Sequence, residues 1–335
     1  MIISKTPFRV SLFGGGTDLP EWLKYNKGKI FSLAIDKYCY ITIRNLNEFF
    51  DYNYAITYHK REHTNSFNKI RHPVVKNLIR IYAKNSRLEI EHKSDLPARS
   101  GIGSSSSFTV GLMNAFLSKN KQISKKLLSK KAIHFEQNIL NETVGNQDQI
   151  RASYGGMGFI KMSKNKFTLK NLSKNNRKLK NIENSILLVY SDVQRNASKI
   201  ETQKIKNLKN SKRSFKNMNY IYEIVCEAEK RILSKNFNIK EIGQLLSEQW
   251  KYKKELSNNI TNTKIDEIYD LLISKGAYGG KLLGAGSGGF IAFLASKSVQ
   301  NKIIRETRNL KILKVRADFQ GSSLINPSYA NLSIK

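Results

Sequence analysis

Residues 96–107 read LPARSGIGSSSS, and a segment with helical spacing, residues 108–117, follows directly. Glycines allow tight turns and let a ligand approach the backbone closely. A helix start offers free N–H groups and the positive end of the helix dipole, which together favour an anion. Four consecutive serines exceed the one residue that a helix cap needs, and their hydroxyls can bind phosphate or Mg²⁺. The stretch therefore predicts a phosphate-binding loop of Gly101, Ile102, Gly103, Ser104, Ser105, Ser106 and Ser107. It lacks the Gly-Lys-Ser/Thr ending of a Walker A motif.

A second glycine-rich segment, residues 281–290, reads KLLGAGSGGF and formally matches G-x-G-x-x-G from Gly284. A dinucleotide-binding fingerprint should follow a strand and open a helix. Here the glycines lead into an apolar, strand-like run, residues 290–294, so the context is wrong for a Rossmann site. A loop that closes over a ligand fits the pattern, and so does a plain tight turn.

A third segment, residues 9–18, reads RVSLFGGGTD and ends a strand-like run. Thr17 and Asp18 could donate or accept hydrogen bonds with sugar hydroxyls. A turn with a local Asx-type hydrogen bond explains the same residues equally well.

Two acids lie between these segments. Glu136 is in the middle of a predicted helix, residues 127–140, and Asp148 follows it in the sequence GNQDQ. A solvated helix face explains the first and a helix cap the second, so neither indicates function by itself.

The composition is that of a large, basic protein with a packed core. The 335 residues suit two domains or one large one, and 40% are hydrophobic. The net charge of +32 comes from lysines spread along the chain, which favours a compositional bias over nucleic-acid binding. Cys39 and Cys226 lie far apart and predict reduced thiols. We find no signal-peptide pattern and no apolar run long enough to cross a membrane, so we expect a cytoplasmic protein without nucleic-acid or membrane partners.

Strand and helix patterns mix in both halves of the chain, which predicts an α+β protein with two lobes. Residues 173–184 are polar and basic, and we expect them to form a surface connection near the lobe boundary. Further strands are expected at residues 4–13, 38–44, 88–92, 158–162, 167–172, 186–190, 290–294 and 310–315. Further helices are expected at residues 74–83, 197–208, 215–233, 239–256 and 265–275.

Taken together, the three segments resemble the GHMP kinase superfamily, which includes galactokinase, homoserine kinase and mevalonate kinase. Residues 97–107 look like its Pro-x-x-x-Gly-Leu-Gly-Ser-Ser loop, with Ile102 in place of leucine. Residues 281–290 look like its third motif, with Ser287 where glycine is common, and residues 7–18 look like its first motif. The resemblance covers most of the chain. It implies the two-lobed GHMP kinase fold, with a ribosomal-protein-S5-like N-terminal lobe (residues 1–178) and a ferredoxin-like C-terminal lobe (residues 179–335).

The resemblance also implies roles for the site residues. ATP would place its phosphates on residues 101–107, and Mg²⁺ would be held by Ser105 and Glu136. Asp148 would face the sugar hydroxyl as base or orienting group, with Arg9 beside it. Phosphoryl transfer depends mainly on positioning and charge neutralisation, so Asp148 can orient more than deprotonate. The acceptor sugar would contact Gly15, Gly16, Thr17, Asp18, Arg195, Lys281, Gly284 and Gly286.

Within the superfamily, residues 9–20, 145–149 and 192–197 are similar to sugar-1-kinases of the D-glycero-D-manno-heptose 7-phosphate kinase type. That branch implies a sugar phosphate as acceptor, a 1,7-bisphosphate as product and a place in nucleotide-activated heptose and surface polysaccharide synthesis. The far phosphate needs cationic partners, for which Lys5, Arg195 and Lys281 are candidates.

Three alternatives remain open. They are a kinase for a free sugar such as fucose, a non-catalytic sugar sensor on the same fold, and a nucleic-acid binder driven by the basic charge. The sequence also leaves a homodimer open and does not fix the anomer.

Overall fold

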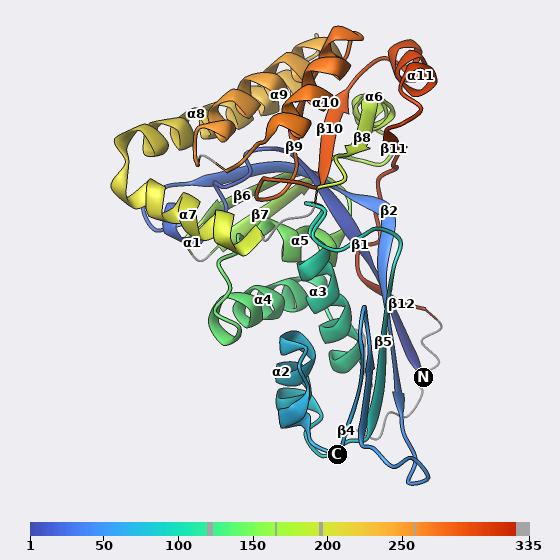
Figure 1. Cartoon of the computed structure of the whole chain (residues 1–335). Helices are drawn as coiled ribbons and strands as arrows, with labels where there is room; N and C mark the ends of the chain where they lie inside the picture. Colours follow the sequence, from blue (N-terminus) through green and yellow to red (C-terminus); the bar gives the residue numbers. More distant parts are fainter. Residues whose placement is uncertain (119–122, 165, 194–196, 258, 326–335) are drawn as a thin grey trace.

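Two sheets and their helices build the computed structural model, which describes residues 1–118, 123–164, 166–193, 197–257 and 259–325 (Figure 1). The larger sheet runs in the order β12-β1-β2-β5-β3-β4, and β6 and β7 extend it from β2. Its strands are β1 (Ile2–Phe13), β2 (Gly28–Asn45), β3 (Tyr54–Thr57), β4 (Arg61–Thr64), β5 (Leu88–Ser94), β6 (Met157–Ser163), β7 (Lys166–Asn171) and β12 (Ser323–Ile325). All pairs are antiparallel except β3 with β5.

β1 and β2 are the central pair of this sheet. Phe8, Val10 and Leu12 of β1 are buried, as expected for apolar side chains that pack on a pleated surface. The register of the pair shifts between Pro7 and Phe8. Such irregularities bend a strand and redirect the side chains that follow. Arg9 follows this shift, and its side chain reaches the serine loop described below, where Nη1 donates to the carbonyl oxygen of Gly101.

Helical segments lie between the strands of the larger sheet in the sequence. They are α1 (Pro20–Leu23), the 3₁₀ turn η1 (Phe67–Lys69), α2 (Pro73–Tyr82), α3 (Ser104–Leu117), α4 (Lys125–His134), the π-helical turn η2 (Phe135–Ile139) and α5 (Gln147–Tyr154). α3 contacts β1, β2 and α5, and its side chains from Ser106 to Phe116 are all buried. Because α3 is buried on every side, its N-terminus is fixed relative to β1.

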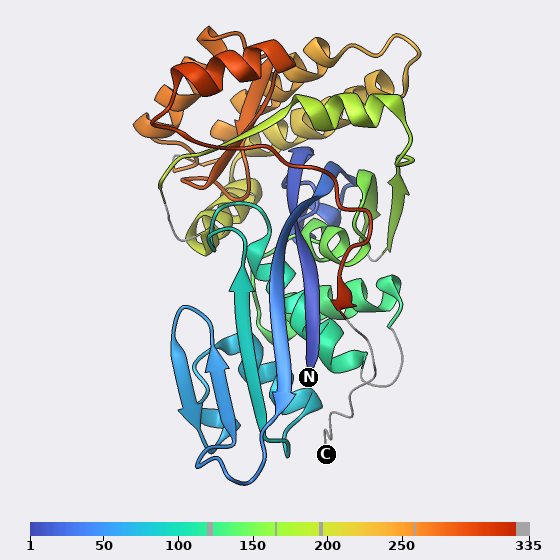
Figure 2. The same ribbon diagram turned by 90° about the vertical axis from the view of Figure 1, so that its right-hand side faces the viewer.

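The smaller sheet runs β11-β8-β10-β9 and lies above the larger one in the view of Figure 1, as Figure 2 also shows. Its strands are β8 (Ile186–Tyr190), β9 (Gly279–Leu282), β10 (Phe290–Leu294) and β11 (Lys311–Leu313). Its helices are α6 (Arg177–Ser185), α7 (Ala197–Asn210), α8 (Lys212–Leu233), α9 (Ile239–Lys254), α10 (Thr263–Ser274) and α11 (Lys297–Glu306). α9 packs against β9, β10 and α8, which places the glycine loop between β9 and β10 above the larger sheet.

The predicted α+β fold is confirmed, and most predicted elements are present. Residues 173–184 are a correction, because they contain α6 and not only a surface connection. Leu179 and Ile182 are the buried residues one turn apart on α6, and Asn176 caps its start. Two apolar residues suffice for a nine-residue helix whose other face is solvated.

Other elements are shorter or more irregular than predicted. The helix expected over residues 127–140 divides into α4 and the π-helical η2. Only Lys311–Leu313 is strand within residues 310–315. α5 and α11 were not anticipated. The chain returns at β12 to pair with β1 of the larger sheet, and the lobe boundary after residue 178 stays a prediction.

Candidate active site

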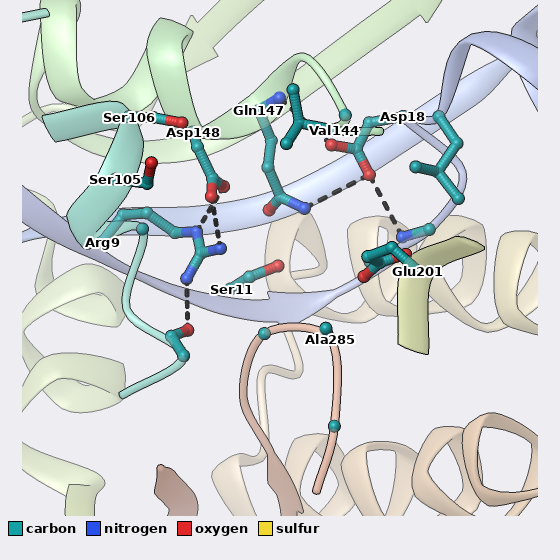
Figure 3. Close-up of a pocket in the computed structure, with 18 of the residues that line it drawn as sticks. Arg9, Ser11, Asp18, Ser105, Ser106, Val144, Gln147, Asp148, Glu201 and Ala285 are labelled. Atoms are coloured by element: carbon teal, nitrogen blue, oxygen red, sulfur yellow. Dashed lines mark hydrogen bonds and ion pairs between the residues drawn. The ribbon is translucent and has the colours of Figure 1, made fainter. Parts of the chain in front are cut away.

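A cavity of about 230 Å³ lies where the two lobes meet (Figure 3). The ends of β1, β9, α3, α5 and the loops beside them supply its walls. The predicted residues on these walls are Arg9, Gly15, Gly16, Asp18, Gly101, Gly103, Ser104, Ser105, Ser106, Asp148, Lys281, Gly284 and Gly286. The structure thus brings all three glycine-rich segments and Asp148 to one place.

The serine loop forms the start of α3. Gly103 is the N-cap residue with a φ of 74°, a left-handed conformation that favours glycine. A Cβ on Gly103 would lie 3.2 Å from Arg9 Cγ and 3.3 Å from Asp148 Oδ2, so glycine also makes room for these side chains. The free N–H groups of the first turn of α3 therefore face the cavity close to Arg9 and Asp148, as an anion site requires.

The four serines differ in what their hydroxyls do. Ser107 donates to the carbonyl oxygen of Pro7 at 2.9 Å, which fixes the helix to β1. Ser106 donates to Glu136 Oε2 at 2.9 Å, and Ser104 accepts from the backbone N–H of Arg99. Ser104, Ser105 and Ser106 line the cavity, whereas Ser107 and Ile102 are buried behind it. The loop thus presents three hydroxyls to a ligand.

The glycine loop between β9 and β10 packs directly on the serine loop. A Cβ on Gly284 would lie 2.7 Å from Gly101 Cα, and one on Gly101 would lie 2.9 Å from the carbonyl oxygen of Leu283. The carbonyl oxygen of Ser100 accepts a hydrogen bond from the N–H of Phe290 at 3.0 Å. The smaller lobe therefore closes the cavity over the serine loop, and the ligand-covering role of residues 281–290 stays a prediction.

Arg9 and Asp148 form a forked ion pair on the cavity wall. Arg9 Nε donates to Asp148 Oδ1 at 2.6 Å and Nη2 donates to Oδ2 at 2.7 Å, while Nη1 donates to the carbonyl oxygen of Gly101 at 2.6 Å. Asp148 lies in the first turn of α5, where the helix dipole stabilises a carboxylate. The pair fixes the orientation of Asp148, and Arg9 ties it to the serine loop.

Asp18 lies in the turn that follows the three glycines. Its Oδ1 accepts from the N–H of Gly16 at 3.1 Å and from Gln147 Nε2 at 3.2 Å, and its Oδ2 accepts from the N–H of Gln147 at 3.1 Å. Burial and, next, the charge of Asp148 raise the pKa of Asp18 above its ordinary value. Two carboxyl groups that repel each other therefore face the same cavity.

Thr17 lies differently from the prediction. Its side chain is buried and donates to the carbonyl oxygens of Gly14 and Lys29, so it shapes the turn and is not part of the cavity wall. Lys5 also lies away from the cavity, with Nζ 3.9 Å from the centre of the Tyr38 ring. Arg195 lies outside the described residues.

Glu136 is fully buried behind the serine loop. Ser106 and Gln149 donate to its Oε2, and Oε1 has no hydrogen-bond partner among the described residues. Burial, followed by the charge of Glu142, raises the pKa of Glu136 to about 7. Over the described ranges no cluster of three His, Cys, Asp or Glu side chains could hold a metal. One carboxylate and serine hydroxyls still fit Mg²⁺, because this ion usually takes its remaining ligands from water and substrate phosphates.

Several cavity residues were missed from the sequence. Lys204 and Glu201 come from α7, Lys253 from α9, and Gln147 from α5. Lysine is so abundant in this chain that no local pattern distinguishes Lys204 and Lys253 from other lysines. Gln147 is next to the predicted Asp148, and its contact with Asp18 gave no sequence signal.

No helix among the described residues is both long and apolar enough to span a bilayer.

A protein of Campylobacter jejuni described as D-glycero-alpha-D-manno-heptose 7-phosphate kinase is 28% identical over 321 residues, covering 92% of this chain and 93% of that protein. A bifunctional fucokinase/GDP-fucose pyrophosphorylase of Arabidopsis thaliana is 22% identical over 90% of this chain, which spans 30% of that protein.

The solved structure of a protein from Bacteriodes thetaiotaomicron, described as a D-glycero-D-manno-heptose 1-phosphate kinase, shares the fold with a TM-score of 0.76. It is 22% identical, and the match covers 97% of this chain and 99% of that one. Two sequence profiles of one family also match the chain. "GHMP kinases N terminal domain" matches residues 68–156 and "GHMP kinases C terminal" matches residues 232–310, which together make up half of the sequence. The chain therefore belongs to the GHMP kinases, a family of ATP-dependent phosphotransferases.

Proposed function

We propose that this kinase transfers the γ-phosphoryl group of ATP to the anomeric hydroxyl of D-glycero-D-manno-heptose 7-phosphate. The product would be the 1,7-bisphosphate, an early compound in the synthesis of nucleotide-activated heptose for surface polysaccharides. The observation that carries the transfer is the forked Arg9–Asp148 pair, which lies at the start of α3 inside the cavity. The choice of acceptor is supported by the 28% identical relative from Campylobacter jejuni.

The N-terminus of α3 is the proposed binding place for the ATP phosphates. Backbone N–H groups after Gly103 and the helix dipole favour the anion, and the hydroxyls of Ser104 and Ser105 can donate to its oxygens. Glu136 with Ser105 or Ser106 would hold Mg²⁺, which neutralises charge on the phosphates when bound. Ser106, rather than Ser105, contacts Glu136 in this structure.

Asp148 is the proposed orienting group for the acceptor. Both of its oxygens accept hydrogen bonds from Arg9, which fixes the carboxylate in one plane. The sugar hydroxyl would donate to this carboxylate and attack the γ-phosphorus. A new O–P bond forms, the bond to the ADP oxygen breaks, and the hydroxyl proton passes to Asp148 or to the transferred phosphoryl group. A loose transition state needs little base strength, so the main contribution of Asp148 is orientation.

Asp18 is the proposed partner of the sugar's other hydroxyls. Gly16 and Gln147 orient its carboxyl, which lines the same cavity as Asp148. The fixed carboxyl would select the hydroxyl pattern of the sugar, because a buried acceptor left unpaired is unfavourable.

A panel of free sugars and sugar phosphates with Mg-ATP tests the proposal, with products identified by phosphorus NMR. We expect a new anomeric phosphate signal with heptose 7-phosphate and little turnover of fucose. Faster turnover of the free sugar would refute the proposed acceptor and support the fucose alternative. If no acceptor in the panel led to ATP hydrolysis or phosphoryl transfer, the result would support the non-catalytic alternative. The Asp148→Asn variant is the control for contaminating kinases.

A further inference from the structure

We propose that Lys281 and Lys204 form the subsite for the terminal phosphate of the acceptor, and that the Glu201 carboxylate occupies this subsite in its absence. This inference rests on the proposed function, because it needs an acceptor that carries a phosphate. It adds two residues, Lys204 and Glu201, that the sequence patterns did not indicate.

Lys281 is a buried cation without a hydrogen-bonded counter-charge. It lies on β9, its side chain is 2% exposed, and it lines the cavity. Its side chain makes no hydrogen bond or ion pair with any residue that the structure describes, and a Cβ on Gly15 would lie 3.8 Å from its Nζ. Burial and then the charges of Arg9 and Lys204 lower the pKa of Lys281 to about 7. Burying an unpaired charge is unfavourable, so this side chain is poised to accept an anion.

Lys204 is the second cation, and it reaches the cavity from α7. Its side chain is only 3% exposed, and both carboxylate oxygens of Glu201 lie 2.9 Å from its Nζ. Glu201 also lines the cavity. A phosphate has more charge and more acceptor oxygens than a carboxylate. It could therefore replace Glu201 as the partner of Lys204 while also satisfying Lys281.

Lys253 is buried nearby but is already committed. Its Nζ donates to the carbonyl oxygens of Leu282 at 2.8 Å and Gly284 at 2.7 Å. Because Leu282 follows Lys281 directly, these bonds fix the strand end that carries Lys281. Lys253 is thus a positioning residue, and burial, followed by the charges of Lys281 and Lys204, lowers its pKa well below the ordinary value.

The two ends of the cavity match the two ends of a sugar phosphate. Figure 3 shows Arg9, Asp148, Ser105 and Ser106 on one side and Asp18 and Glu201 on the other. An acceptor whose anomeric hydroxyl faces Asp148 would extend past Asp18 toward Glu201. Its terminal phosphate would then come close to Lys204 and Lys281.

Steady-state kinetics on paired acceptors test the assignment. Wild type, Lys281→Met and Lys204→Met would be compared on D-glycero-D-manno-heptose 7-phosphate and on the unphosphorylated heptose. Each variant should lose about 10- to 100-fold in kcat/KM for the phosphorylated acceptor, as expected for a hydrogen bond between charged groups. The loss in kcat/KM on the free heptose should be less than about threefold, because this acceptor has no phosphate for the lysines to bind. The KM for ATP should not change. Lys254→Met is the matched control, because Lys254 on α9 pairs with Asp266 and is not part of the cavity wall.

A gain of affinity guards against variants that fail to fold. Glu201→Gln weakens the competing ion pair, so the KM for heptose 7-phosphate should fall while that for the free heptose stays the same. Equal losses on both acceptors in the lysine variants, or a raised KM for ATP, would overturn the subsite and leave the proposed acceptor intact. A wild-type protein that prefers the free heptose would refute the proposed acceptor and the subsite together.

Discussion

Replacement of Asp148 by asparagine separates the orienting role of this residue from its structural role. The change keeps the shape of the side chain but removes its charge. Asparagine has one acceptor oxygen, so one of the two hydrogen bonds from Arg9, at 2.6 and 2.7 Å, must be lost. The amide N–H₂ group would then face an Arg9 N–H group, and the acceptor hydroxyl would lose its oriented carboxylate.

The expected effect on rate is much larger than the effect on stability. A positioned acid–base group contributes about 10²- to 10⁴-fold in rate, so kcat should fall by that factor. A hydrogen bond to a charged group contributes about 1.5–3 kcal/mol. Because Asp148 is 22% exposed, we expect the lower end, about 1.5 kcal/mol of unfolding free energy, from that principle. The corresponding fall in melting temperature is about 3–6 °C.

Coupled measurement of ADP release and thermal unfolding on the same samples checks this prediction. The control is Glu89→Gln, which breaks the exposed Arg44–Glu89 pair between β2 and β5 and should leave kcat unchanged. If Asp148→Asn kept kcat within a fewfold of wild type and only raised KM, the orienting role would be refuted. A rate loss matched by global unfolding would equally contradict it.

Three further changes test other parts of the site. The Mg²⁺ concentration for half-maximal rate should increase as the pH falls through about 7. Burial raises the pKa of Glu136 to about 7, so a proton competes with the ion below that pH. Mg²⁺ titrations above and below this pH test the prediction, and an unchanged Mg²⁺ requirement would show that Glu136 does not bind the ion. Gly145→Ala should raise the acceptor KM by about tenfold or more, since the new Cβ would lie 2.0 Å from Asp18 Oδ2 and displace a hydrogen-bonding carboxyl. An unchanged acceptor KM in steady-state kinetics would argue against Asp18 as an acceptor-binding residue. Arg151→Met should lower the unfolding free energy by about 3 kcal/mol or more, because the carbonyl oxygens of Gly155 and Gly158 lose a buried charged donor. Denaturant unfolding measures this change. A loss of kcat in protein that is still folded would contradict a purely structural role for Arg151.

The local motifs were predictable because backbone conformation and sequence are tightly coupled in them. Gly103 is needed where φ is 74°, and Gly101 and Gly284 are needed where two backbones touch. The sequences of residues 97–107 and 281–290 therefore indicated two glycine-rich loops, which the structure brings to one cavity, and their roles as phosphate loop and cover stay predictions. The strand signals of β1, β8 and β10 were equally clear, because their side chains are buried almost without interruption.

Features that depend on contacts far apart in the chain were not predictable. α6 carries two buried apolar residues, so its apolar pattern was too short to detect. Gln147 contacts Asp18 across 129 positions, and Lys204 and Lys281 come to one cavity from α7 and β9. In a chain with 58 lysines and arginines, the cations of the cavity cannot be distinguished from those on the surface by sequence alone.

Buried charge connects the chemistry of this cavity with its two-lobed construction. Lys281 is buried without an ion-pair partner among the described residues, and burial raises the pKa of Asp18 and of Glu136. Each group opposes folding, because a charge removed from water is unfavourable until it is compensated. Phosphates and Mg²⁺ would supply that compensation only when they are bound, which links ligand binding to stability. Lys281 comes from the smaller sheet and Asp18 from the lobe of the larger sheet, so a ligand that contacts both side chains must bind the two lobes at once. That requirement favours phosphoryl transfer in a closed, water-poor cavity over hydrolysis of ATP.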